Sequence, residues 1–343
     1  MAYTTIKKPS DYFNTKLYTG NGSTQSITGV GFQSDWTWIK PRSTTGNHRI
    51  TDAVRGATKQ IYADLTNAEN TNTNGLTAFG TDGFTVGSDS GYNGNGVTFA
   101  SWNWLGANGT SANTDGSISS TVSANTTSGF SIVSWTGSGA NATIGHGLGA
   151  EPKMIFLKIR TGTNNWQVYN KSIGSGNALF LNTTDASSSN TGWQSTDATS
   201  SVFYVSGGGA VNGSGQDLIA YCFAEKKGFS KFGSYTGNGN ADGTFVYTGF
   251  KPAFVISKAS STTSNWHMWD NKRDIDNVIE HILWSNLANA EITSGYTPID
   301  FLSNGFKMRD NNGAWNGSGT TYIYMCFAEN PFVTSTSVPA TAR

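Results

Sequence analysis

The strongest constraint on this fold is an internal repeat that runs through nearly the whole chain. Each copy opens with an aromatic residue followed by Thr-Gly-x-Gly, and it then reaches an apolar segment that ends in lysine. The opening aromatic residues lie 117 and 100 residues apart, at Tyr18, Trp135 and Tyr235. The lysines lie 118 and 100 residues apart, at Lys40, Lys158 and Lys258. Because two landmarks shift together, the chain contains three related units.

The match continues beyond the lysines. Twelve residues after each lysine stands a short carboxylate or amide side chain, at Asp52, Asn170 and Asp270. An Asn-Gly-x-Gly segment follows in each copy, beginning at Asn93, Asn212 and Asn316. Each copy then ends in an aromatic or apolar strand sequence, at Trp102-Asn-Trp104, Tyr221-Cys-Phe223 and Met325-Cys-Phe327.

The length of the repeat predicts the kind of fold. Solenoid and propeller units span about 20–50 residues, whereas a unit of about 100 residues matches a complete β-sandwich. Strand-forming segments rich in Val, Ile, Phe, Tyr and Trp alternate with Gly- and Asn-rich turns. We therefore expect an all-β chain with three tandem antiparallel β-sandwich domains, of jelly-roll or lectin-like type, each with its own core. The expected boundaries are an N-terminal extension at 1–9, repeats at 10–106, 129–227 and 228–332, a linker at 107–128 and a C-terminal tail at 333–343.

The linker at 107–128 is dominated by Ser, Thr, Asn and Gly and has no counterpart between the second and third repeats. This composition predicts a loose first joint and a tight second one. Repeats two and three would then move together as an outer block, and the N-terminal extension with repeat one would anchor the protein.

Composition narrows the classes of protein to consider. Charged residues make up only 13% of the chain, and 22 basic side chains balance 22 acidic ones. A neutral chain without a basic run is not expected to bind nucleic acid. No apolar run is long enough for a membrane span, and the N-terminal residues lack the apolar core of a signal peptide. We therefore expect assembly in a cytoplasm, with Cys222 and Cys326 as unpaired core residues.

Few residue patterns indicate chemistry. Asp52 and Asp270 could form part of a glycosidase, but Asn170 at the same place in repeat two favours a role in fixing a turn. The four histidines show no metal spacing and no triad order, so we expect no catalytic residue, no cofactor and no metal site. Calcium held by Asp, Asn and carbonyl oxygens in a loop remains an alternative.

Three tryptophans are candidates for ligand contact. Trp166, Trp266 and Trp269 occur in Asn-rich segments, where an exposed indole can stack on a sugar ring. These three side chains are the candidates for contact with a host-surface glycan or receptor, although aromatic residues of small sandwiches more often pack in the core.

Several motifs resemble a family of tail and fibre-like virion proteins of marine bacteriophages, including phages of picocyanobacteria. These are Asp11-Tyr-Phe-Asn-Thr-Lys-Leu-Tyr-Thr-Gly-Asn-Gly22, Trp38-Ile-Lys-Pro-Arg42, Ser128-Gly-Phe-Ser-Ile-Val-Ser-Trp-Thr-Gly137, Ala220-Tyr-Cys-Phe-Ala-Glu225 and Lys231-Phe-Gly-Ser-Tyr-Thr-Gly-Asn-Gly239. The resemblance covers nearly the whole chain and brings no catalytic motif with it.

The resemblance implies a non-enzymatic virion protein on the particle surface, such as a tail fibre or adhesin. The alternatives are a capsid decoration protein and a polysaccharide-degrading tailspike. The expected partners are other virion proteins and host carbohydrate. We also expect a homo-oligomer, most simply a trimer, although three domains in one chain could supply threefold symmetry within a monomer.

Overall fold

The computed structural model describes residues 3–333, and the predicted C-terminal tail lies outside them except for Val333. The fold is nearly all β, as expected. Its helical segments are single turns: α1 (Ser90–Asn93) and two 3-10 turns, η1 (Pro9–Asp11) and η2 (Lys171–Ile173). No helix among the described residues is long and apolar enough to cross a membrane.

Each repeat contributes one large antiparallel sheet, and the strands follow the same order in all three. In repeat one the neighbours are β1 (Phe13–Thr19), β9 (Thr98–Trp104), β3 (Trp36–Pro41), β4 (Arg49–Asp52), β5 (Lys59–Tyr62) and β6 (Asn70–Thr71). In repeat two they are β12 (Phe130–Thr136), β19 (Asp217–Ala224), β14 (Pro152–Ile159), β15 (Gln167–Asn170), β16 (Asn177–Phe180) and β17 (Ser188–Ser189). In repeat three they are β20 (Ser230–Thr236), β27 (Thr321–Pro331), β22 (Phe250–Ala259), β23 (Trp266–Asp270) and β24 (Leu283–Trp284).

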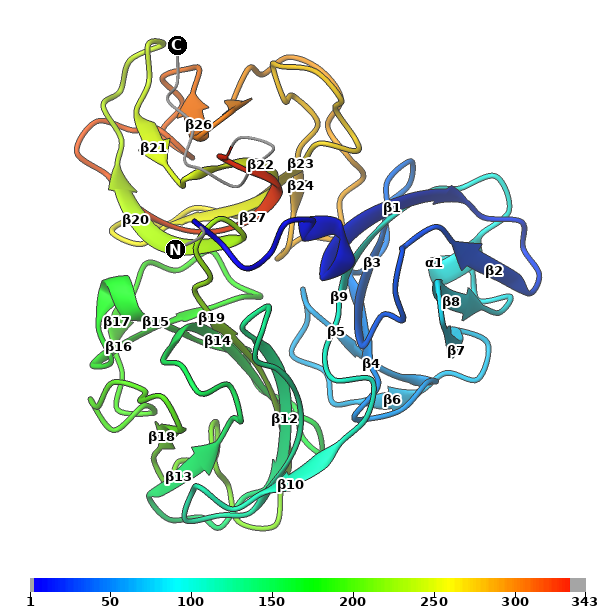
Figure 1. Cartoon of the computed structure of the whole chain (residues 1–343), viewed down its shortest axis with the longest axis vertical. Helices are drawn as coiled ribbons and strands as arrows, with labels where there is room; N and C mark the ends of the chain where they lie inside the picture. Colours follow the sequence, from blue (N-terminus) through cyan, green and yellow to red (C-terminus); the bar gives the residue numbers. More distant parts are fainter. Residues whose placement is uncertain (1–2, 334–343) are drawn as a thin grey trace.

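A smaller sheet packs on the outer side of each large one (Figure 1). These sheets are β2 (Gln25–Thr28), β8 (Gly83–Val86) and β7 (Leu76–Gly80); β13 (Ala142–Gly145) and β18 (Val202–Val205); and β21 (Phe245–Tyr247), β26 (Gly305–Met308) and β25 (Ile299–Leu302). Each pair of sheets encloses a core that draws on one repeat alone. The sandwich architecture predicted from the repeat is therefore present.

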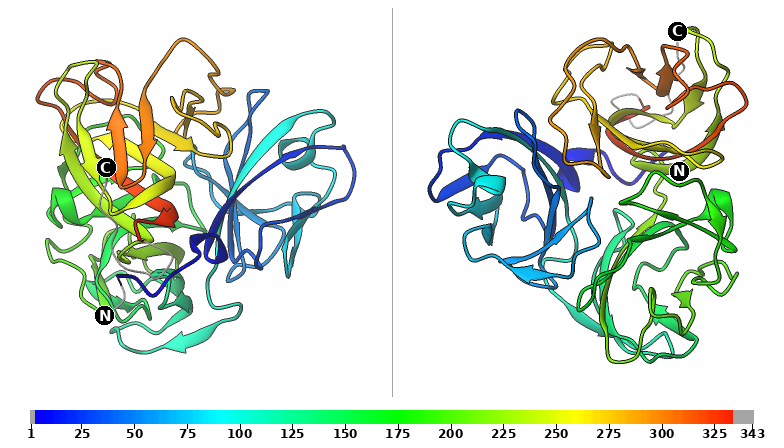
Figure 2. Two further views of the ribbon diagram at one scale, coloured as in Figure 1. Left: turned by 45° about the horizontal axis from the view of Figure 1, so that its top comes forward. Right: turned by 180° about the vertical axis from the view of Figure 1, so that it is seen from behind.

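The three sandwiches are arranged around one centre, in front and rear views alike (Figures 1 and 2). The inner faces of their large sheets meet in a fourth core that contains residues of all three repeats, among them Trp36, Trp104, Phe156, Phe254 and Met325. The expectation that every repeat has a separate core is therefore incomplete. The central strands alternate between two buried faces, one toward the centre and one toward the small sheet, so β3, for example, is buried at every position.

The opening motif of each repeat is explained by a close backbone approach. The glycine after Tyr18-Thr, Gly20, packs so tightly against the Asn-Gly-Asn-Gly turn that a Cβ would lie 2.3 Å from the Gly94 carbonyl oxygen. Gly137 and Gly237 stand in the same relation to the corresponding turns of their repeats. No side chain fits there, and the motif recurs for that reason.

The predicted loose linker at 107–128 is wrong in its central part. Here β10 (Ser111–Asn113) and β11 (Ser120–Asn125) add two strands to the large sheet of repeat two. Along β11, the buried residues Ser120 and Val122 flank the exposed Thr121, and Val122 packs into that repeat's core. This alternation among small, mostly polar residues is sufficient for a strand, because β12 at the edge of the sheet is available for pairing. The idea that repeats two and three swing as a block also conflicts with the shared central core.

The N-terminal extension crosses from repeat one to repeat three (Figure 2). Ile6 is buried in the central core, and the Tyr3 hydroxyl donates to the Gly249 carbonyl at 3.1 Å. Residues 3–9 thus connect repeat one with repeat three.

Candidate functional site

The tryptophans predicted to contact glycans are buried rather than exposed. Trp166, Trp266 and Trp269 each have 0% of their surface accessible. Trp166 and Trp266 point into the central core, whereas Trp269 packs in the core of repeat three beside His267 and Trp315. Core packing is therefore the role of all three rings, and they do not provide a glycan surface.

Two of these tryptophans instead link neighbouring repeats. The Trp166 indole donates to the Tyr62 carbonyl of repeat one at 2.8 Å, and Trp266 donates to the Phe180 carbonyl of repeat two at 2.9 Å. His48 holds the corresponding position at the seam, or contact surface, between repeats one and three, beside the Trp284 backbone. Burial holds the pKa of His48 well below its ordinary value, so its imidazole is neutral.

The repeat lysines make a second ring of contacts. Lys158 donates to the Thr66 carbonyl of repeat one at 3.1 Å, Lys258 to Thr184 of repeat two at 3.2 Å and Lys40 to Ala288 of repeat three at 3.3 Å. All three side chains are fully buried. Burial lowers the pKa of each to about 8, although Asp64 and Glu291 act against it at Lys40 and Asp185 acts against it at Lys258. Each lysine therefore fastens a loop of the adjacent repeat by hydrogen bonds.

Buried networks of charged side chains connect neighbouring repeats at two of the three seams. At the seam between repeats one and two, Tyr221 donates to Asp52 at 2.7 Å, Asp52 pairs with Arg55, and Arg55 contacts Glu69 at 3.2 Å. Glu69 also accepts from Arg160 of repeat two at 2.9 Å. The two arginines hold the pKa of Glu69 below its ordinary value against the opposing effect of burial.

The seam between repeats three and one repeats this chemistry. Trp102 donates to Asp270 at 3.1 Å, Asp270 pairs with Arg273 at 2.6 Å, and Arg273 reaches Glu291 at 2.9 Å. Arg42 of repeat one completes the chain by pairing with Glu291 at 2.7 Å. Although burial opposes it, Arg273 holds the pKa of Asp270 below its ordinary value.

The seam between repeats two and three has uncharged residues at every position where the other two seams have charged ones. Asn170 replaces the aspartate, Ile173 the inner arginine, and Met325 the aromatic donor. Ser187 and Ser260 stand where the other seams have glutamate and outer arginine, and the Ser187 hydroxyl donates to the Ser260 carbonyl at 3.0 Å. The substitutions are mutually consistent, since a buried carboxylate without Arg and a donor would be costly.

These contacts account for the carboxylates considered for catalysis. Asp52 and Asp270 each accept backbone N–H groups two or three residues ahead, as Asn170 does, which confirms the turn-fixing interpretation. Their remaining oxygens are occupied by arginines inside the protein. No group of three or more potential metal-ligating side chains gathers anywhere in residues 3–333. Cys222 and Cys326 are free and buried in the cores, as expected, and burial raises the pKa of both thiols.

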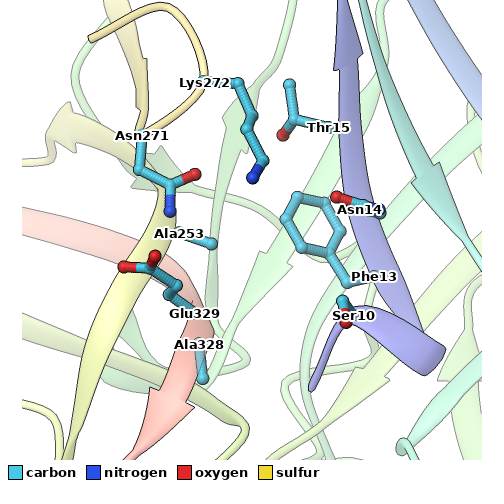
Figure 3. Close-up of a pocket in the computed structure, with 9 residues that line it drawn as sticks. All are labelled: Ser10, Phe13, Asn14, Thr15, Ala253, Asn271, Lys272, Ala328 and Glu329. Atoms are coloured by element: carbon cyan, nitrogen blue, oxygen red, sulfur yellow. The ribbon is translucent and has the colours of Figure 1, made fainter. Parts of the chain in front are cut away.

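One small hollow lies in the seam between repeats one and three. Figure 3 shows Phe13, Asn14 and Thr15 of β1 facing Asn271 and Lys272 across it. The Thr15 hydroxyl and the Asn271 side-chain oxygen are buried without partners. Thr15 occupies the position of Ile132 and Phe232 in the other repeats, so its smaller side chain leaves the space.

The fold and its contacts define an all-β protein in which three sandwich repeats close around a common core. No significant match is found among curated proteins. A family model described as a domain of unknown function, DUF7483, matches residues 8–331. The chain belongs to this family, and the matched region contains all three repeats within one family unit.

Proposed function

We propose that this protein is a non-enzymatic structural protein of a bacteriophage particle, placed on the particle surface as a tail-fibre or adhesin-type component. The motif resemblance supplies the class of protein. The observation that carries the proposal is the cyclic closure of three repeats by buried indole, lysine and arginine contacts. Such a body is rigid and presents three similar outer sheets, which suits attachment at a threefold-symmetric position.

The proposed partners are other virion proteins and host-surface carbohydrate. One chain already contains three equivalent units about a centre, which favours the monomeric alternative over the homotrimer expected from sequence. Light scattering tests this point: the proposal predicts 36.5 kDa for the purified protein, and a mass three times larger supports the homotrimer.

The location on the particle is the direct test. Purified particles from infected cultures would be analysed by mass spectrometry and by electron microscopy after labelling with an antibody to this protein. We expect labelled protein on the outside of intact particles, and the position of the label separates tail from capsid. Expression in infected cells without any copy on purified particles would overturn the proposal. Release of reducing ends from host polysaccharide, lost when a single carboxylate is replaced, would favour the tailspike alternative.

A further inference from the structure

Two aromatic rings remain exposed on the outer face of repeat three. Phe245 and Tyr247, on the edge strand β21, are 44% and 53% accessible, while Val246 between them is buried. Side chains two residues apart on a strand point to the same side, so both rings lie on one face about 7 Å apart along the strand. Adjacent exposed apolar side chains that are rimmed by polar residues can mark a ligand-binding site, whereas single scattered ones are ordinary.

The other repeats show that the fold does not require these rings. β21 pairs with β26 in the same register in which β2 pairs with β8 and β13 with β18. The positions of Phe245 and Tyr247 are taken by Ser26 and Thr28 in repeat one. In repeat two they are taken by Thr143 and Gly145. Small or polar residues therefore suffice for this strand, and the aromatic pair is specific to repeat three.

The surroundings of the pair combine a flat surface with polar groups. Gly305, opposite Tyr247 on β26, has no side chain, and the Phe245 ring lies close to its backbone. Lys307, opposite Phe245, forms an ion pair with Asp242, and Arg309 pairs with Asp300 at 3.2 Å. These four charges sum to zero, so the face offers hydrogen-bonding groups without a net charge.

We propose that Phe245 and Tyr247 form a platform on which one or two sugar rings of a neutral glycan stack, with Asp242 and Lys307 as hydrogen-bonding partners of its hydroxyl groups. Two half-exposed rings offer roughly 200 Å² of apolar surface. A stable contact with a second copy of the chain needs about 800 Å² per partner, so the patch suits a small ligand better. The charge balance favours a neutral ligand over an acidic one. The proposal rests on the proposed function, since it locates the host-glycan contact of a particle-surface protein.

A glycan array carrying neutral and acidic oligosaccharides tests the platform, followed by calorimetric titration of the strongest neutral ligand. The test variant is Phe245→Ser with Tyr247→Thr, which installs the residues of repeat one at the same positions. The matched control is Ile275→Ser, which removes the exposed apolar side chain of a different segment. We expect neutral oligosaccharides to bind the wild type and the control, and the double variant to bind at least about tenfold more weakly, because stacking on both rings is lost.

Absence of neutral-glycan binding by the wild type, or unchanged binding by a folded double variant, would overturn the platform. Circular dichroism and melting temperature establish that the double variant is folded. Particle labelling gives an independent result. Surface labelling without glycan binding would contradict only the proposed glycan platform. Glycan binding by a protein that is absent from particles would contradict only the proposed function.

Discussion

At the residue scale, the central contacts are buried carboxylates that receive a donor from the neighbouring repeat. Tyr221 reaches Asp52 across one seam, and Trp102 reaches Asp270 across another. Both carboxylates are fully buried, so each hydrogen bond replaces water that the group would otherwise have. The free energy of unfolding therefore depends on matched residues in two repeats at once.

Replacing Tyr221→Phe should lower the free energy of unfolding by about 1–3 kcal/mol, because Asp52 loses a donor inside the protein. Chemical denaturation measures the change. Tyr296→Phe is the control, since that side chain is 39% exposed, and it should have little effect. Equal stability of Tyr221→Phe and the wild type would show that the cross-repeat hydrogen bond does not contribute.

The buried lysines predict how the free energy of unfolding depends on pH. Because each folded-state pKa is about 8, below the ordinary 10.5, the unfolded chain binds more protons than the folded chain between these values. Each lysine should therefore raise the free energy of unfolding as the pH increases from about 8 to 10, by at most about 1.4 kcal/mol per pH unit. The buried thiols of Cys222 and Cys326, whose pKa is raised, act in the opposite direction in this range. Denaturation across this range measures the slope. Lys158→Met should reduce the slope by up to a third of the lysine contribution, and an undiminished slope in that variant would contradict the assignment.

At the scale of elements, β10 and β11 turn the segment after repeat one into part of the sheet of repeat two. Hydrogen exchange should therefore be slow at the amides of Ser120–Asn125, which pair with β12. The exposed residues 109–110 serve as the internal comparison and should exchange quickly. Rapid exchange throughout 107–128 would restore the loose linker predicted from composition.

The internal repeat made the strands of each sheet predictable. It did not predict how the large sheets of the three repeats pack against one another. Landmarks such as Lys40 and its two counterparts located equivalent strands. The Asn-rich flanks of Trp166 and Trp266 left the choice between exposure and burial open, because the sequence does not show which sheet faces pack together. One signal was present in the sequence: Asp52, Arg55 and Tyr221 change together to Asn170, Ile173 and Met325, which indicates a contact between repeats. Phe245 and Tyr247 could have been found as departures from the repeat.

At the scale of the whole molecule, a shared core makes the three repeats one folding unit. The central cluster takes large side chains from every repeat, and removing one repeat would expose the inner faces of the other two. Exposure of that much apolar surface is unfavourable, so an isolated repeat should not be stable alone. The match of one family model to residues 8–331 agrees with a unit of this size.

Differential scanning calorimetry of the full chain is the most direct test of this claim. The account predicts one transition whose calorimetric enthalpy equals the van't Hoff enthalpy, with no separate melting of a repeat. Its companion sample, residues 107–227 alone, keeps β10 and β11 with the rest of repeat two and should show no cooperative transition. Three resolved transitions in the full chain, or an isolated second repeat that melts at the temperature of the intact protein, would contradict a common core.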